Sequence, residues 1–73
     1  MNRCEVFIES YTLTMKAQMV LANHGWKSSV RRHTGEDGCG YILSTAADCE
    51  SLSDILESHG IYGKILRRHR RDW

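Results

Sequence analysis

The sequence lacks any apolar run close to the ~20 residues that a membrane-spanning helix needs. Its opening stretch, residues 1–6, is too short and too charged for a secretory signal peptide. It has no Cys-x-x-Cys pair, and its cysteine count of 3 is odd, which is typical of reduced thiols rather than of a disulfide framework. We therefore expect a cytoplasmic protein with free cysteines and no membrane partner.

Net charge and aromatic residues are also scarce. A formal net charge of +1 gives the whole molecule little attraction for a polyanion. Phe7 and Tyr41 are the only aromatic candidates on the expected central strands, too few for an RNA-stacking platform. We expect no nucleic-acid partner, although the arginines between residues 67 and 71 keep phosphate contact open as a weaker alternative.

What remains is a normal globular composition. Hydrophobic residues make up 41% and charged residues 26% of the 73 positions, which indicates one small folded domain over residues 1–73 rather than a disordered chain. A chain this short buries only ~60% of its unfolded surface, and small domains often gain stability by forming a homodimer, so a homodimer is one alternative for the oligomeric state.

Hydrophobic periodicity predicts the order strand, helix, strand, strand, helix, strand. Period-two alternation or β-rich composition indicates four strands, at residues 3–10, 26–33, 41–45 and 61–68. Helical spacing indicates two helices, at residues 12–24 and 49–59. Ser10 or Thr12 is expected to cap the first helix and Asp48 the second.

The two halves of the chain resemble each other. His24-Gly25 leads to an Arg-Arg-His stretch at residues 31–33, and His59-Gly60 leads to another at 67–69. This repeat predicts an α+β, ferredoxin-like βαββαβ fold: a four-stranded antiparallel sheet in the order fourth, first, third, second, with two helices on one face. Both Arg-Arg-His stretches then lie on edge strands, and residues 69–73 form a frayed basic tail.

Cys39 lies in a glycine-rich stretch at residues 35–41 that joins the two middle strands. Gly38 and Gly40 flank the cysteine, and glycine permits tight turns, so we expect Cys39 to be an exposed thiol on a turn. The alternative, which we weigh equally, is an ordinary hairpin in which Cys39 is only the first residue of a strand.

The predicted topology brings this loop to the start of the first helix, beside Ser10, Tyr11 and Thr12. Unpaired N–H groups there favour a thiolate. His33 and His59 are expected at the same rim and act in the same sense, whereas the acidic residues at 36–37 oppose it. The predicted site has Cys39 as its reactive residue; its binding residues are Gly38, Gly40, Ser10, Thr12, His33 and His59.

Other chemistries fit the sequence less well. Hydrolysis by Cys39 needs an orienting partner and a concave pocket for which this chain has little room. No ligand spacing supports a metal site. We therefore expect neither an enzyme, nor a metal, nor a cofactor.

Several segments together resemble the DUF3343 proteins, a family described as selenium or sulfur carrier-like. They are Phe7-Ile8-Glu9-Ser10, the helix that ends at Gly25, the basic second strand, Cys39-Gly40-Tyr41 and Gly60-Ile61. The resemblance implies that Cys39 is the carrier residue. This chain differs from the family in having Thr34-Gly35-Glu36-Asp37-Gly38 before that cysteine, where members commonly have a proline and a serine-rich segment.

Two functions from different classes follow. The first is a sulfur or selenium carrier that holds a persulfide or selenosulfide on Cys39 and works with a donor enzyme and an acceptor protein. The second is a ferredoxin-like regulatory or protein-interaction module that uses no cysteine chemistry.

Overall fold

The protein is described here by a computed structural model that covers residues 3–35 and 38–69, with residues 67–69 described by their backbone. The elements are β1 (Arg3–Ile8), α1 (Tyr11–Asn23), β2 (Ser28–Gly35), β3 (Gly38–Thr45), α2 (Cys49–Ser58) and β4 (Lys64–His69). The predicted sequence of strands and helices is confirmed.

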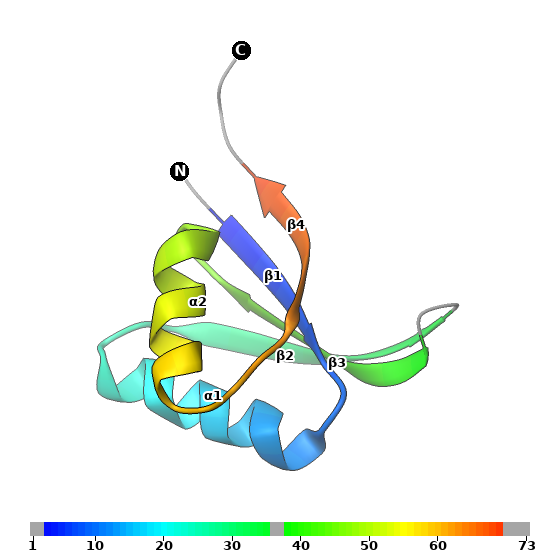
Figure 1. Cartoon of the computed structure of the whole chain (residues 1–73). Helices are drawn as coiled ribbons and strands as arrows, with labels where there is room; N and C mark the ends of the chain where they lie inside the picture. The colour runs from blue at the N-terminus through cyan, green and yellow to red at the C-terminus, as the bar shows by residue number, and fades with distance from the viewer. Residues whose placement is uncertain (1–2, 36–37, 70–73) are drawn as a thin grey trace.

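The four strands form one antiparallel sheet in the order β2-β3-β1-β4, as predicted. Both helices lie on the same side of this sheet (Figure 1). The edge strands are β2 and β4, which carry the two Arg-Arg-His stretches. β4 continues to His69, which pairs with Arg3, so the strand enters the predicted tail by one residue; residues 70–73 lie outside the described part of the chain.

The core lies between the sheet and the helices. Because side chains alternate along a strand, Cys4, Val6 and Ile8 of β1 face the helices and are buried. From the helices, α1 contributes Ala17 and Leu21, and α2 contributes apolar residues at helical spacing. The full buried cluster is Cys4, Val6, Ile8, Ala17, Leu21, Leu43, Cys49, Leu52, Leu56 and Ile61.

Side-chain caps fix where both helices begin. The Ser10 hydroxyl accepts a hydrogen bond from the Leu13 amide at 3.2 Å, so Ser10, and not Thr12, caps α1. Asp48 caps α2 by accepting from the Ser51 amide at 3.4 Å, as predicted. The hydrogen bond from the Ser51 side chain is the main cause that lowers the pKa of Asp48.

The expectation of three free thiols is wrong, because Cys4 and Cys49 form a disulfide. Cys4 lies on the helix-facing side of β1, and Cys49 is the first residue of α2, which packs against β1. The two Cα atoms lie 5.2 Å apart, within the range that a disulfide spans. Cysteine count and spacing did not reveal this pair, because the two residues are 45 positions apart and only the packing of α2 on β1 brings them together.

The glycine-rich stretch also differs from the prediction. β2 and β3 pair continuously from Ser28 opposite Thr45 to Gly35 opposite Gly38, so Cys39 belongs to the ladder and lies opposite Thr34. Cys39 is therefore a strand residue, as in the alternative interpretation, although β3 begins one residue earlier, at Gly38; the expected exposure of Cys39 is confirmed. The paired strands thus include Thr34, Gly35 and residues 38–40, which we expected to form a loop.

Gly40 has a packing role rather than a turn role. It is buried, and a Cβ atom at this position would lie 2.6 Å from Cζ of Phe7 and 2.9 Å from the Ile8 carbonyl oxygen. Only glycine lets β3 pass this closely to β1.

In the described part of the chain, no helix has the length and apolar character required to cross a bilayer.

Candidate functional site

Cys39 is exposed, and it is the free cysteine of the three, all of which lie in the described residues. It borders an open hollow of about 140 Å³. The other residues that line this hollow are Glu9, Arg32, Gly40 and Tyr41. β1, β2 and β3 converge here, so the thiol stands beside side chains from three segments of the chain.

Strand register determines which side chains share this hollow. Residues directly opposite each other in an antiparallel pair lie on the same face of the sheet, and Arg32 lies opposite Tyr41. Cys39 is two residues before Tyr41 on β3, toward the hairpin end, and therefore shares that face. The Tyr41 ring meets the Tyr11 ring edge-on, with centroids 5.4 Å apart. The hollow is thus on the side of the sheet that carries the helices, next to the start of α1.

The charges around Cys39 oppose one another. Arg32 favours an anion in the hollow, whereas the Glu9 carboxylate disfavours one. Guanidinium groups remain charged at all physiological pH values and donate up to five hydrogen bonds. The hollow therefore brings one positive and one negative side chain beside the exposed thiol.

His33 does not join this site. It lies opposite Gly40 and contacts the Phe7 ring edge-on at 5.7 Å between centroids. Phe7 alternates with Val6 and Ile8, which face the helices, so Phe7 and His33 lie on the opposite face of the sheet from Cys39. His33 therefore shields Phe7 and cannot assist the thiol directly.

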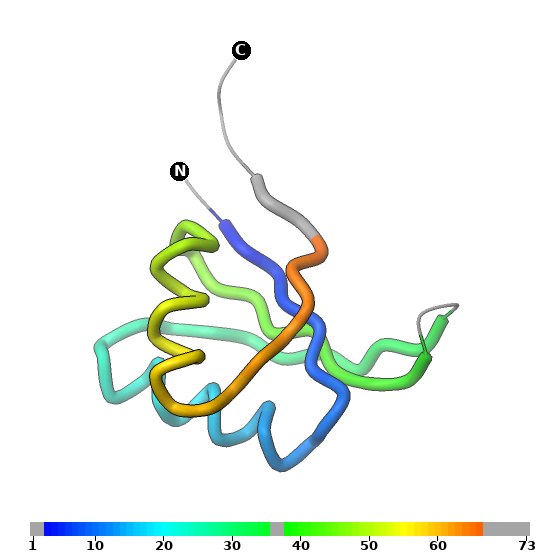
Figure 2. The backbone as a smooth tube through the Cα atoms, in the orientation of Figure 1, coloured from blue at the N-terminus to red at the C-terminus, as the bar shows by residue number. Residues whose placement is uncertain are grey.

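His59 is also distant from the thiol. It caps the C-terminus of α2, and its carbonyl oxygen accepts a hydrogen bond from Lys16 Nζ at 3.3 Å. Figure 2 shows the end of α2 on the far side of the molecule from the projecting β2–β3 hairpin. The prediction that His33 and His59 lie at the same rim as Cys39 is therefore wrong. α2 ends beside α1 rather than beside the hairpin, which keeps His59 away from the thiol.

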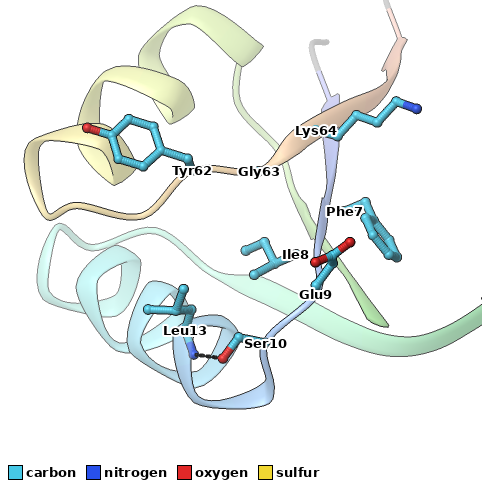
Figure 3. A pocket seen from close by; sticks show the side chains of 8 residues that line it. All are labelled: Phe7, Ile8, Glu9, Ser10, Leu13, Tyr62, Gly63 and Lys64. Atoms are coloured by element: carbon cyan, nitrogen blue, oxygen red, sulfur yellow. Dashed lines mark hydrogen bonds between the residues drawn. The ribbon is translucent and has the colours of Figure 1, made fainter. Parts of the chain in front are cut away.

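Ser10 lines a neighbouring cleft of about 570 Å³ rather than the Cys39 hollow. The Ser10 hydroxyl accepts the capping hydrogen bond from the Leu13 amide, and Thr12 is exposed. The cleft lies between the end of β1, the start of α1 and the segment that leads into β4 (Figure 3). Its lining residues are Phe7, Ile8, Glu9, Ser10, Leu13, Tyr62, Gly63 and Lys64.

Glu9 lines both the cleft and the Cys39 hollow, so the two depressions are adjacent. In Figure 3, Ile8 points toward the space between Leu13 and Tyr62. An apolar floor with a few polar groups at the rim is typical of small-molecule sites.

Within residues 3–35 and 38–69, no group of three or more His, Cys, Asp or Glu is arranged to hold a metal.

Glu9 and Arg32 are the residues that sequence reasoning missed. The sequence pattern predicts only that Arg31 and Arg32 lie together on an edge strand. Strand alternation separates the two: Arg32 shares the face of Tyr41, whereas Arg31 lies 3.6 Å from Glu5 on the other face. The strands predicted at residues 26–33 and 41–45 would place His33 opposite Tyr41, whereas the tighter hairpin of the structure places Arg32 there.

These features define a small α+β protein with one exposed, free thiol beside an arginine. No protein-family model, curated protein or solved structure matches the chain. The resemblance to the DUF3343 proteins therefore stays a prediction from the sequence.

Proposed function

We propose that the protein is a non-enzymatic carrier that holds sulfur or selenium on Cys39 as a persulfide or selenosulfide. The observation that supports this proposal is the contrast among its cysteines: Cys39 is exposed beside Arg32, while Cys4 and Cys49 are buried and bonded to each other. A carrier needs an accessible nucleophile and a docking surface, and it needs no deep pocket. The resemblance to the DUF3343 family points to the same residue.

The proposed loading step conserves electrons. The Cys39 thiolate attacks the outer sulfur of a persulfide on a donor protein, a new S–S bond forms on Cys39, and the donor's S–S bond breaks. The donor cysteine leaves as a thiolate, so no external oxidant or reductant is consumed. Arg32 is placed to stabilise the resulting persulfide anion.

The fold class and the compartment belong to the same proposal. We assign the βαββαβ arrangement to the ferredoxin-like class because of its strand order and its two helices on one face. A cytoplasmic location requires the Cys4–Cys49 bond to survive among reducing thiols, where disulfides are rare. Cys4 is 0% and Cys49 5% exposed, so burial limits access of a reducing thiolate to either sulfur.

Loading of Cys39 can be tested with glutathione persulfide as the donor. Intact-protein mass should increase by one sulfur atom in the wild-type protein and remain unchanged in Cys39→Ser. Peptide mass should place the added sulfur on Cys39. Persistent loading of a correctly folded Cys39→Ser protein would eliminate this function.

Two neighbouring arginines provide a matched pair of variants. Arg32→Gln should slow loading, because Arg32 lines the Cys39 hollow. Arg31→Gln removes the same charge from the opposite face, where Arg31 pairs with Glu5, and should leave the rate nearly unchanged. Equal rates for the two variants would show that Arg32 has no local role.

The second candidate is a ferredoxin-like regulatory or interaction module without cysteine chemistry. The cleft of about 570 Å³ favours it, since that volume is within the usual range for small-molecule sites. Tyr62, which is 70% exposed at the rim, provides an apolar surface for a ligand or a partner. Size measurement before and after alkylation separates the candidates: a homodimer that persists when Cys39 is blocked, in a protein that cannot be loaded, supports the module.

A further inference from the structure

A second polar hollow lies at the other end of the sheet from Cys39. Its volume is about 250 Å³, and it lies where β3 ends and β2 begins. The residues that line it are Arg3, Lys27, Ser28, Ser29, Ser44, Thr45 and Ala46. They include two cations and four hydroxyl-bearing side chains, and no carboxylate.

Ser28 and Ser44 in this set each have a buried hydroxyl oxygen without a hydrogen-bond partner among the described residues. Of the two, Ser44 is the one on the open face of the sheet. It is 4% exposed. Buried hydroxyls nearly always have a partner, because leaving one unpaired costs stability. Ser44 follows Leu43, which faces the helices, so its side chain lies on the open face of the sheet together with Ser29, its opposite neighbour on β2.

The charges near Ser44 also favour an anion. Arg3 precedes Glu5 by two positions on β1 and therefore shares the open face, and Lys27 comes directly before β2. Glu5 lies opposite Ser44 and would oppose an anion, but its Oε2 atom lies 3.6 Å from Arg31 Nη1. That pairing leaves Arg3 and Lys27 as the charges that border the hollow.

We propose that this hollow binds a phosphate group. Arg3 and Lys27 supply charge-assisted hydrogen bonds, and the Ser29 and Ser44 hydroxyls donate to further oxygens of the same tetrahedral anion. At about 250 Å³, the hollow is large enough for one phosphate group. Arg3 is the first residue of β1 and Glu9 follows its last residue, so the two hollows lie at opposite ends of the strand and this site is independent of the proposed carrier function.

NMR titration of the full chain with inorganic phosphate, at constant ionic strength, tests the proposal. Backbone amides of Ser28, Ser29 and Ser44 should shift and reach saturation. Lys27→Gln should weaken binding about tenfold, as expected for loss of one charge-assisted contact. Lys16→Gln, which removes an exposed charge on α1, should bind phosphate like the wild type. Weak, unsaturated shifts that are the same in both variants would overturn the site.

Ser44→Ala separates ligand binding from a structural role. Removing an unpaired buried hydroxyl should leave stability equal or increased, while phosphate binding weakens several-fold. Unchanged phosphate binding in this variant would remove Ser44 from the site and overturn the proposal as stated.

A parallel titration with phenyl phosphate identifies the source of the phosphate group. Tighter binding of inorganic phosphate would identify the free ion as the ligand. Tighter binding of phenyl phosphate would identify a phosphomonoester on a larger molecule, and either result supports the site. Absence of saturable binding by both would overturn it.

Discussion

The two ends of β1 lie in opposite kinds of surroundings. Near its start, Cys4 is buried and bonded to Cys49 of α2, in the middle of an apolar cluster. Just past its other end, Glu9 borders an open hollow with the exposed thiol of Cys39. One strand therefore separates a cysteine pair that stabilises the fold from a cysteine that is available for chemistry.

Packing, and not the local sequence around each cysteine, creates this difference. Cys4 and Cys49 meet because α2 covers the helix-facing side of β1. Cys39 stays free because it lies near the end of the β2–β3 hairpin, which projects beyond the helices (Figure 1). Substitution of the cysteines should therefore affect stability at the disulfide end and reactivity at the Cys39 end.

The largest stability effect is expected from the disulfide end. Cys4→Ala/Cys49→Ala should lower the free energy of unfolding by about 4 kcal/mol, because the bond closes a loop of 45 residues in the unfolded chain. Urea unfolding monitored by circular dichroism measures this change. Cys39→Ser is the matched control and should change stability by less than about 0.5 kcal/mol. A control variant that loses as much stability as the double variant would erase the distinction between the two ends.

Gly40→Ala should have the next largest effect, although Gly40 is adjacent to the free thiol. Its Cβ would lie 2.6 Å from the Phe7 ring and 2.9 Å from the Ile8 carbonyl oxygen, so β3 or Phe7 must move, at a cost of about 2 kcal/mol. Gly35→Ala in the same hairpin meets only the His33 side chain at 3.4 Å and should be nearly neutral. Thermal unfolding of the two variants should rank them clearly, and equal melting temperatures would contradict the packing role of Gly40.

The start of α1, next to the Cys39 hollow, should show a smaller effect. Ser10→Ala removes the cap from the Leu13 amide and should destabilise the protein by about 1 kcal/mol. Thr12→Ala, two residues away on an exposed position, should be within about 0.5 kcal/mol of the wild type. The reverse ranking would show that Thr12 is the cap. Urea unfolding is sufficient for both.

The cap at the start of α2 should produce a small, pH-dependent effect near the disulfide end. The pKa of Asp48 is lowered in the folded protein by its hydrogen bond from the Ser51 side chain. The ionised cap therefore stabilises the fold above about pH 4, near the unfolded pKa, and this stabilisation is lost as the pH falls through the lower folded pKa. Asp48→Asn keeps a good capping residue without the titration, so its stability should vary less between pH 5 and pH 3. An identical pH dependence in both proteins would contradict this role.

Most of the fold could be predicted from the sequence. Strand alternation in Arg3–Ile8, helical spacing after Ser10 and the repeated His-Gly stops gave the strand order correctly. Boundaries in the middle of the chain were less accurate, because glycine was interpreted as loop-forming. In the structure, Gly40 lies within β3, where it permits close packing against Phe7.

The site was less predictable because it depends on which face each side chain occupies. Topology correctly brought the start of α1 to the hairpin, as the Tyr11–Tyr41 contact shows. His33 was placed at the right end of the sheet but on the wrong face, and Arg32 was overlooked although its register with Tyr41 places it there. The Cys4–Cys49 bond depends on contact between a strand and a helix that are distant in sequence, which local patterns do not encode.

The most direct test of the contrast between the two ends is a count of alkylated cysteines by intact mass. Protein purified without reductant is treated with iodoacetamide, first native, then denatured, and finally denatured after reduction. We predict one adduct, on Cys39, in the native and the denatured protein, and three adducts only after reduction. Three adducts without reduction would show that Cys4 and Cys49 are unpaired, and a native protein without any adduct would show that Cys39 is protected; either result would contradict the account.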